Sequence, residues 1–341
     1  KFMNHYVGID LHSNNSYLAI INETGEVKFK QKLPNDAEII LKALNVFRKS
    51  FIVGVVVEST FNWYWLVDAL QEAKYKVHLA NPSEMEQYNG LKHTDDKSDA
   101  IWLAEMLRLN ILPTGYIYPR EERALRDLLR KRMLLVRHRT SLLLSLKGTI
   151  HNWTGNGTSR SEIKKICNEE FPSIFDNKHT ALSANSLNNV IDSFNNEIEE
   201  IEKTVFQKMA SVPQHKQLLS VDGIGSVLAA TIVLETGDIS RFADVGNFSS
   251  YCRCVKSEKF SNERKKGSGN KKNGNRYLAW AFIEAAYYMK RYNQKAKAWF
   301  DKKSSRRGTI VAMKALSNKI ARACYFIMRD QVPFNPVKLF G

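Results

Sequence analysis

The sequence has few cysteines and no long hydrophobic run, and both absences narrow the class of protein. Its four cysteines are too few and too irregularly spaced for a disulfide framework or a structural zinc site. Cys252 and Cys254 are separated by a single residue, which is tighter than the usual gap between two zinc ligands. We therefore expect packing residues or free thiols at Cys167, Cys252, Cys254 and Cys324.

No apolar run approaches the ~20 residues that a membrane-spanning helix requires. Residues 1–5 lack the apolar stretch of a secretory signal. These absences predict a cytoplasmic protein. A chain of 341 residues with mixed composition is long enough for two or three globular domains.

Positive charge is in excess, but only in one part of the chain. The formal net charge is +16, yet residues 1–115 hold 12 Lys and Arg against 14 Asp and Glu. The remaining residues therefore carry the whole surplus. A basic region of this size favours a polyanionic partner, because neutralised phosphates release counterions. A basic surface that serves only solubility is the alternative.

The order of apolar segments in the first 80 residues predicts an α/β domain. Residues 51–57 are apolar at nearly every position, as in a central strand covered on both faces. Asp36 is placed to cap a helix. The expected strands are residues 6–11, 16–22, 27–33, 51–57 and 76–80, and the expected helices are residues 37–49 and 61–73. This order is that of an RNase H-like fold, although other α/β arrangements share it.

Four acidic residues stand where such a fold could bring them together. Asp10 lies on the first strand, Glu58 ends the central strand, and Asp96 and Asp99 are three residues apart at the start of a predicted helix. Four converging carboxylates would repel one another without a cation. Two Mg²⁺ ions would remove that repulsion and could clamp the attacking and leaving oxygens of a phosphodiester. Each acid alone could be a turn cap, a strand end or a solvated helix start, but their joint placement favours a metal site.

The middle of the chain predicts two long helices. One covers residues 120–150, and the other covers residues 187–209 with apolar residues close to heptad spacing. The pattern fits an antiparallel arm, a dimerising coiled coil or a helical bundle within one chain. Basic residues of the first helix could follow a phosphate backbone or form a solvated face, and the candidates are Arg123, Arg126 and Arg130.

The last third of the chain is predicted to be mainly α-helical. Residues 221–225 fit a helix-hairpin-helix turn in which Gly223 and Gly225 would let backbone amides approach a phosphate; a plain interhelical turn is the alternative. Residues 259–276 hold seven basic residues and one acid, and predict a flexible loop that moulds to nucleic acid. Its candidate contacts are Arg264, Lys265, Lys266, Lys271, Lys272 and Arg276. Helices are expected over residues 277–292 and 310–328, with Tyr287 and Tyr288 in the core.

Four short stretches match the motifs of one known family: Val7-Gly8-Ile9-Asp10, Val57-Glu58, Asp96-Lys97-Ser98-Asp99-Ala100 and Phe260-Ser261-Asn262. On these, the chain resembles the DEDD-type transposases of the insertion-sequence family numbered one-ten, particularly its eleven-eleven branch. Two departures stand out. Asp95 separates Thr94 from Asp96, so the spacing to Asp99 selects Asp96 and leaves Asp95 as the alternate ligand. Glu263 stands where a glycine is common after the family's serine.

The resemblance implies a RuvC-like, RNase H-like domain over residues 1–117, a helical or coiled-coil region over residues 118–212, and a transposase domain over residues 213–341. It implies that Mg²⁺ is bound by Asp10, Glu58, Asp96 and Asp99, and that Ser261 is the nucleophile that forms a transient phosphoserine bond to DNA. It also implies a dimer or tetramer and a structured guide RNA. The alternatives are a nuclease of the Holliday-junction resolvase type, acting through the acids alone, and a non-catalytic nucleic-acid-binding protein.

Overall fold

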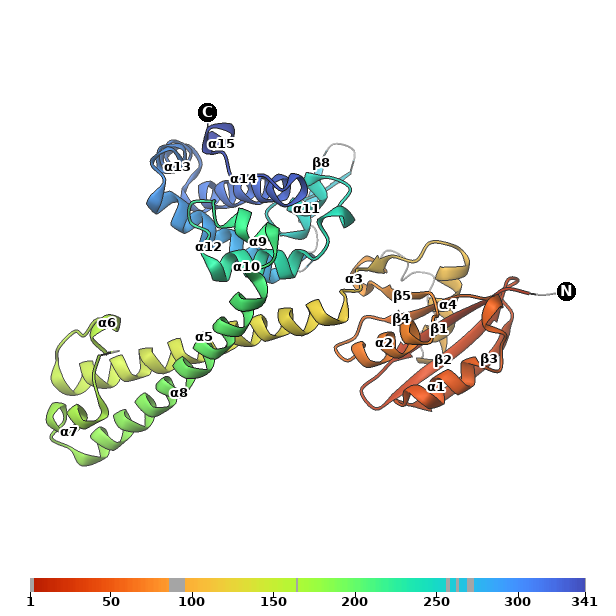
Figure 1. Ribbon diagram of the computed structural model, residues 1–341, viewed down its shortest axis with the longest axis horizontal. Helices are drawn as coiled ribbons and strands as arrows, with labels where there is room; N and C mark the ends of the chain where they lie inside the picture. Colours follow the sequence, from red (N-terminus) through yellow and green to blue (C-terminus); the bar gives the residue numbers. More distant parts are fainter. Residues whose placement is uncertain are drawn as a thin grey trace. The chain divides into compact units, whose positions relative to one another are not determined.

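The computed structural model describes residues 3–85, 96–163, 165–255, 258–261, 264–268 and 273–340. The chain forms two compact units, residues 1–120 and residues 121–341 (Figure 1). The first unit thus ends at residue 120, where the sequence predicts 117, and the boundary predicted after residue 212 falls inside the second unit. None of the helices in this described part is long and apolar enough to cross a membrane.

The first unit is built on a mixed sheet with the strand order β3-β2-β1-β4-β5-β6. The five strands predicted from the sequence are present, and β1 pairs antiparallel with β2 and parallel with β4. The sixth strand has two residues, too few to give a sequence pattern. The strands are β1 (His5–Leu11), β2 (Asn15–Asn22), β3 (Val27–Pro34), β4 (Ile52–Glu58), β5 (Val77–Ala80) and β6 (Thr114–Gly115).

Helices pack on both faces of this sheet. Odd-numbered residues of β1, such as Val7 and Ile9, share an apolar cluster with residues of α1 and α2. On the other face, Val56 of β4 packs against Leu103 of α4. Since side chains alternate along a strand, the even-numbered Gly8 and Asp10 of β1 face α4. The helices are α1 (Ala37–Leu44), α2 (Tyr64–Glu72), α3 (Pro82–Met85) and α4 (Asp96–Arg108), with a 3₁₀ turn η1 (Lys49–Phe51) before β4.

Helix α1 illustrates how the sequence sets the ends of an element. The Asp36 side chain accepts hydrogen bonds from the backbone N–H groups of Glu38 and Ile39, at 2.8 and 3.1 Å, and so caps the helix as predicted. The helix ends at Leu44 rather than at residue 49, and residues 49–51 form the separate turn η1.

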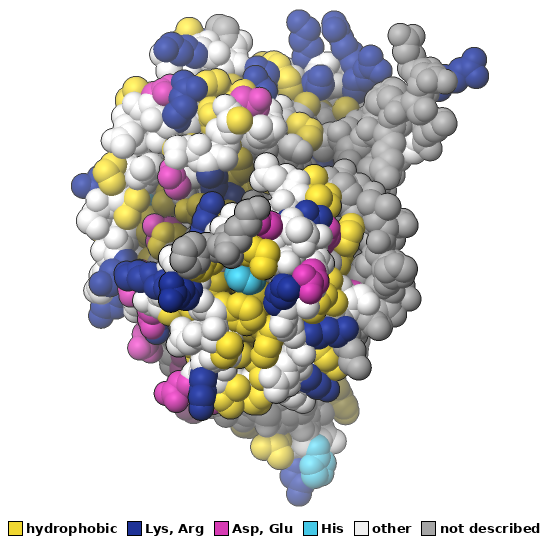
Figure 2. All heavy atoms as spheres, turned by 90° about the vertical axis from the view of Figure 1, so that its right-hand side faces the viewer, with side chains coloured by type: hydrophobic (Ala, Val, Ile, Leu, Met, Phe, Trp, Pro, Cys, Tyr) yellow, Lys and Arg dark blue, Asp and Glu magenta, His cyan; other side chains and the backbone are white. Residues whose placement is uncertain are grey.

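On the face of the molecule that Figure 2 shows, the described charged side chains are mixed in sign. Figure 2 shows Lys and Arg side chains interspersed with Asp and Glu side chains, with hydrophobic side chains between them. This mixture agrees with the near-neutral balance of residues 1–115, so the positive surplus of the chain belongs to the second unit.

The second unit begins with an antiparallel pair of long helices (Figure 1). The two helices are joined along their length: Arg132 donates to Glu202 at 2.6 Å and Arg139 donates to Asn195 at 2.8 Å. The sequence fits an antiparallel arm, a dimerising coiled coil or a bundle within one chain. The structure shows an antiparallel arm formed within one chain. The helices are α5 (Arg120–Thr154) and α8 (Lys178–Met209), and the connection between them holds α6 (Arg160–Ile163), η3 (Asn168–Glu170) and α7 (Phe171–Ile174).

Helix α8 begins nine residues before the predicted start at 187. The Asn177 side chain caps it by accepting from the N–H groups of His179 and Thr180, at 2.9 and 3.3 Å. Polar residues fill the first turns, so their apolar pattern is weak, but Ala181 and Ala184 pack against Phe171 in a buried cluster. Tertiary packing thus extends a helix that local pattern alone does not predict.

The rest of the second unit is a helical bundle around one core that includes Phe248 and Phe282. The basic segment expected as a flexible loop instead contains two short antiparallel strands. Tyr287 and Tyr288, expected in the core, are 50% and 38% exposed. The elements are α9 (Pro213–Leu218), α10 (Ser226–Thr236), η4 (Ile239–Arg241), α11 (Val245–Tyr251), β7 (Glu258–Ser261), β8 (Arg264–Ser268), α12 (Arg276–Tyr292), α13 (Gln294–Arg307), α14 (Thr309–Asp330) and α15 (Pro336–Phe340).

Candidate active site

Two of the predicted acids lie side by side at one edge of the sheet. Strands β1 and β4 are parallel neighbours, and Ile9 stands opposite Val57. The next residues, Asp10 and Glu58, therefore come to the same end of adjacent strands. The Glu58 side chain is close enough to raise the pKa of the Asp10 carboxyl group. The structure thus confirms the predicted adjacency of these two residues.

The third acid, Asp99, reaches them because α4 lies directly on β1. At Gly8, a Cβ atom would stand 2.0 Å from the carbonyl oxygen of Ala100 and 2.8 Å from the backbone nitrogen of Ala104. Only a residue without a side chain permits this approach of the helix backbone to the strand. Asp99, next to Ala100 on α4, comes close enough for its charge to act on Asp10.

The environment of Asp10 disfavours its ionised form. Asp10 is 3% exposed, and its burial is the largest influence that raises the pKa of its carboxyl group, to about 7. The nearby His12 lowers this pKa, whereas the hydrogen bond and charge of Glu58 and the charge of Asp99 raise it. The His12 Nε2 atom is 3.1 Å from the Asp10 Oδ2 atom.

A divalent cation suits the chemistry of this donor set. Glu58 of β4 and Asp99 of α4 both act against ionisation of Asp10, and His12 is the one described side chain that acts in its favour. Hard cations such as Mg²⁺ prefer carboxylate oxygens and would offset this repulsion. The described side chains alone include no group of three or more His, Cys, Asp or Glu arranged to hold a metal ion. The fourth acid, Asp96, begins α4, but its side chain, like the whole of Asp95, lies outside the described part.

His12 is a neighbour of the site that the sequence reasoning missed. It follows Asp10 by two residues, so alternation along an extended segment places both side chains on one face. Its ring also meets that of Tyr17 edge to face at 6.0 Å. The signal was available as an Asp-x-His spacing on the first strand, but a single histidine near an acid is not specific.

Replacing Gly8 by Ala is expected to disturb the site through packing alone. The added methyl group would displace the α4 backbone, and overpacking of this kind costs about 1–3 kcal/mol. We expect a lower melting temperature for the first unit, together with weaker stabilisation by Mg²⁺, in thermal unfolding followed by circular dichroism. Gly115→Ala is the matched control, because a Cβ atom there would meet its neighbours at an ordinary 3.7 Å. Equal behaviour of the two variants would contradict this role for Gly8.

The segment that carries Ser261 is the hairpin of β7 and β8. In its register Ser261 stands opposite Arg264, and Glu258 stands opposite Ser268. Arg264 is exposed, as is Arg276 at the start of α12. The side chains of Ser261, Lys265 and Lys266, and the whole of Lys271 and Lys272, lie outside the described residues.

The three arginines singled out on α5 do not form an exposed row. Arg123 and Arg126 are 2% and 5% exposed. Arg130 donates two hydrogen bonds to the buried carboxylate of Glu235, at 2.6 and 2.7 Å. Arg123 and Arg126 are therefore too buried to contact a nucleic acid in this arrangement, and the part-exposed Arg130 is already engaged by Glu235.

Comparison with known proteins identifies the family of this chain. Residues 7–152 match the family of DEDD transposases named after IS110, and residues 215–301 match the transposase family IS116/IS110/IS902. The chain belongs to the IS110 family of DEDD transposases.

Two curated relatives of the transposase cover most of its length, and a third covers less than half of it. The transposase for insertion sequence element IS1111A of Coxiella burnetii is 22% identical over 339 residues, which is 95% of this chain and 90% of the relative. A probable family 20 transposase of Pseudomonas aeruginosa is 22% identical over 285 residues, or 80% of this chain and 82% of the relative. The transposase for IS1328 of Yersinia enterocolitica is 24% identical over 143 residues, covering 41% of this chain and 43% of the relative. DNA transposition is therefore the activity of the family.

The two glycines of the turn between α9 and α10 have different surroundings in the transposase. Gly223 has a φ of +88°, and a Cβ atom there would lie 2.4 Å from the backbone nitrogen of Met289 on α12. Gly225 caps α10 with ordinary extended angles, and a Cβ atom there would meet nothing within 4 Å. Gly223 is thus required by packing within the bundle, whereas Gly225 is open toward solvent and remains a candidate for nucleic-acid contact.

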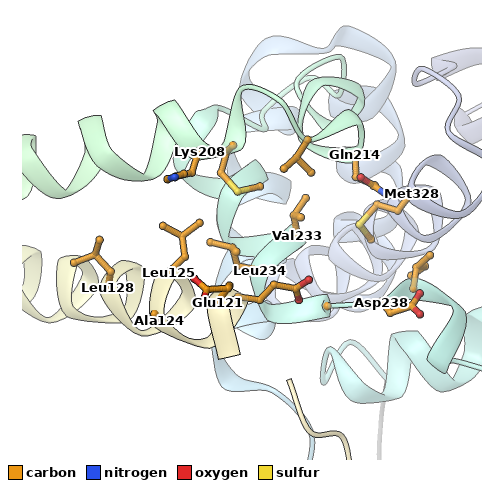
Figure 3. A pocket seen from close by; sticks show the side chains of 15 residues that line it. Glu121, Ala124, Leu125, Leu128, Lys208, Gln214, Val233, Leu234, Asp238 and Met328 are labelled. Atoms are coloured by element: carbon orange, nitrogen blue, oxygen red, sulfur yellow. The ribbon is translucent and has the colours of Figure 1, made fainter. Parts of the chain in front are cut away.

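A cavity of about 760 Å³ lies where the transposase's helices α5, α8 and α10 meet (Figure 3). Apolar side chains such as Leu125, Leu128 and Val233 line it, and Glu121 and Asp238 lie at it as well. With Glu122 the lining holds three acidic side chains against one basic side chain, Lys208, and this excess of acids disfavours a phosphate. None of the predicted site residues lines it.

Proposed function

We propose that this transposase cuts and rejoins DNA through Ser261, with divalent cations held by Asp10, Glu58, Asp96 and Asp99. The observation that carries the proposal is that Asp10 and Glu58 end adjacent parallel strands, with Asp99 of α4 near enough for its charge to raise the pKa of the buried Asp10 carboxyl group. The sheet order and the acids at its edge support an RNase H-like domain of the RuvC type. Mg²⁺ is the cation that best suits such ligands in phosphodiester chemistry.

The proposed reaction exchanges one phosphodiester bond for another. The Ser261 Oγ atom attacks a DNA phosphorus, the bond from that phosphorus to the leaving DNA oxygen breaks, and the proton of the serine hydroxyl ends on the leaving oxygen. A phosphoserine link results. Attack by the hydroxyl of a second DNA end then reverses these events and restores the serine. When bound, the cations would stabilise the charge that develops on the phosphate oxygens.

The positive surplus of the second unit supports binding of a polyanion, without distinguishing DNA from RNA. Membership of a transposase family supports DNA as the substrate, and the family resemblance is the basis on which we propose a structured RNA as guide to the target. Since the acids belong to one unit and Ser261 to the other, we propose that they meet in a dimer or tetramer, within one subunit or between two. Arg264, Arg276 and Gly225 are the described candidates for contact with nucleic acid, beside Lys265, Lys266, Lys271 and Lys272.

The products distinguish this proposal from a metal-dependent nuclease of the Holliday-junction resolvase type. The purified chain would be incubated with Mg²⁺, a duplex that spans the joined ends of its own insertion sequence, and the structured RNA that the element is proposed to encode. A transposase of this kind should give recombinant strands with new phosphodiester bonds and no added nucleotide energy source. A nuclease should give only shortened strands with free ends, and a non-catalytic binding protein should leave the DNA intact. Either of the last two results would overturn the proposal.

A further inference from the structure

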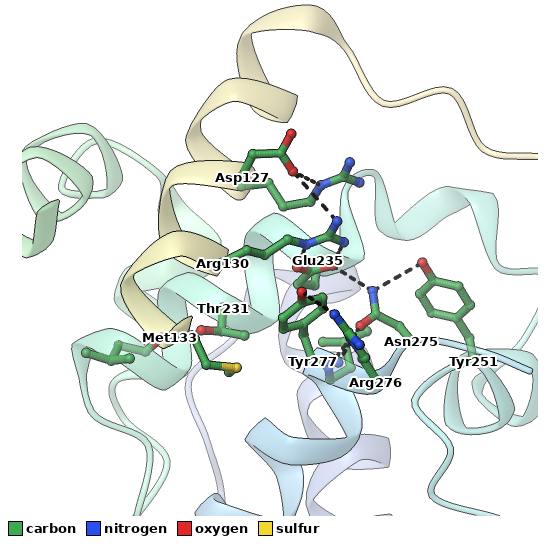
Figure 4. Close-up of polar contacts among 12 residues, drawn as sticks. Asp127, Arg130, Met133, Thr231, Glu235, Tyr251, Asn275, Arg276 and Tyr277 are labelled. Atoms are coloured by element: carbon green, nitrogen blue, oxygen red, sulfur yellow. Dashed lines mark hydrogen bonds and ion pairs between the residues drawn. The ribbon is translucent and has the colours of Figure 1, made fainter. Parts of the chain in front are cut away.

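A buried polar network links three elements of the second unit (Figure 4). Its centre is Glu235 on α10, which is 2% exposed. One carboxylate oxygen accepts from Arg130 Nε at 2.6 Å, and the other accepts from Arg130 Nη2 and from Asn275 Nδ2, each at 2.7 Å. The Arg130 guanidinium also lies 4.5 Å from the centre of the Tyr277 ring. Each oxygen of a buried charged group is thus satisfied.

Arg130 is held in its charged form by this contact. Burial lowers the pKa of its guanidinium, but the hydrogen bonds and charge of Glu235 outweigh burial, so the pKa lies above its ordinary value. Burying such a pair gains little stability compared with apolar side chains of similar size. A buried ion pair that adds little to stability can instead fix one arrangement of the elements it joins.

Through Asn275, the network also reaches the place where the two ends of the segment that carries Ser261 lie together. The segment follows Tyr251, the last residue of α11, passes the buried Cys252 and Cys254 of the bundle core, and returns at Asn275, the cap of α12. The Asn275 backbone N–H donates to the Tyr251 carbonyl oxygen at 2.6 Å, and its Nδ2 lies 3.4 Å from the Tyr251 hydroxyl. Glu235 therefore contacts, through Asn275, the point where both ends of the segment meet.

Two further contacts close the same junction. Arg253 donates from Nε and Nη2 to the Gly274 carbonyl oxygen, at 3.1 and 2.8 Å. Gly274 has a φ of +86°, and a Cβ atom there would lie 2.4 Å from the Tyr251 carbonyl oxygen. The Asn275 Oδ1 atom accepts from the N–H groups of Tyr277 and Leu278, at 2.8 and 3.1 Å, which fixes the side chain that Glu235 holds. The junction has little freedom to shift while these contacts persist.

We infer that Glu235 is a positioning residue for the serine reaction: with Arg130 and Asn275 it holds the base of the β7–β8 hairpin in the orientation from which Ser261 reacts. The inference rests on the proposed role of Ser261. Glu235 does not touch DNA in this scheme, and acts only through Asn275. Nucleophilic attack is sensitive to placement, since a displacement of about 1 Å can cost on the order of 100-fold in rate.

Glu235→Gln tests this inference in the full-length protein. The amide keeps the shape of the side chain, but it lacks the charge and presents a donor toward either Arg130 or Asn275, both of which also donate. We expect the rate of covalent Ser261–DNA adduct formation at saturating DNA to fall roughly 10- to 100-fold. The Kd for the same duplex should stay within about threefold, because the exposed basic residues are unchanged. Amide hydrogen exchange should quicken at residues 251–255 and 273–278.

Ile232→Val is the matched control, because Ile232 is fully buried on the same helix but belongs to the apolar core. It should lower the melting temperature of the second unit without slowing adduct formation. The inference would be overturned if Glu235→Gln formed the adduct at a rate within twofold of the parent. It would also be overturned if a control variant with the same melting temperature as Glu235→Gln slowed adduct formation to the same degree. If the parent itself forms no adduct, the proposed function fails. Hydrogen exchange at Asn275 then decides alone whether Glu235 fixes the segment, and unchanged exchange would overturn that claim too.

Discussion

Ser261→Ala is expected to abolish strand exchange and the covalent protein–DNA adduct. The variant lacks the only atom that can form the proposed phosphoserine bond, and loss of a nucleophile commonly costs on the order of 10⁴-fold or more in rate. Non-covalent binding of DNA should persist, because the basic residues of the β7–β8 hairpin remain. Denaturing gel electrophoresis of the DNA-bound protein measures the adduct, and electrophoretic mobility shift measures binding.

Ser268→Ala is the control for this experiment. Ser268 lies on β8 of the same hairpin, opposite Glu258, so its replacement changes the hairpin's composition to the same degree. It should retain adduct formation within about threefold. Strand exchange by Ser261→Ala at the parent rate would refute the serine mechanism, and Mg²⁺-dependent cleavage without joining would favour the nuclease.

Asp10→Asn is expected to have opposite effects on stability and on response to metal. Burial and the neighbouring carboxyl groups raise the pKa of Asp10 to about 7, so its ionised form is unfavourable in the apo fold. A neutral amide removes that penalty and can donate to Glu58. We expect the free energy of unfolding of the first unit in EDTA to rise by about 1–2 kcal/mol, since one pKa unit corresponds to about 1.4 kcal/mol.

The same substitution should remove the stabilisation that Mg²⁺ confers on the parent. A ligand at 100 times its Kd stabilises the folded state by about 2.7 kcal/mol, and the variant has lost a central ligand. Thermal unfolding with EDTA and with excess Mg²⁺ measures both effects. Glu38→Gln, in the exposed first turn of α1, is the control and should respond to Mg²⁺ as the parent does. An undiminished response in Asp10→Asn would contradict the assignment of Asp10 as a ligand.

The sequence predicts the sheet and its acids because the relevant signals are local. Apolar runs mark β1 and β4, and acids at their ends must meet if the strands are parallel neighbours. The approach of α4 could not be predicted in the same way. It depends on Gly8 meeting the backbone of Ala100 and Ala104, which lie more than 90 residues along the chain. No periodicity within either segment encodes such a contact.

The burial of basic and aromatic residues in the second unit does not follow from the local sequence. Arg130 has the pattern of a surface residue, but its partner Glu235 is 105 residues away and draws it into a buried network. Tyr287 and Tyr288 have the composition of core residues but lie on the exposed side of α12. A helical stripe shows which residues share a face, and only the packing of the other helices decides which face is covered.

The central claim is that Ser261 becomes linked to DNA in a reaction that needs the acidic cluster. The most direct measurement is to trap the protein on its joined-end duplex with Mg²⁺, digest both components, and locate the attached nucleotide by mass spectrometry. We expect one modified residue, Ser261, in the parent, and no modified residue in Asp10→Asn. A nucleotide attached to another residue, or an adduct at Ser261 that forms equally well in Asp10→Asn with EDTA, would contradict it.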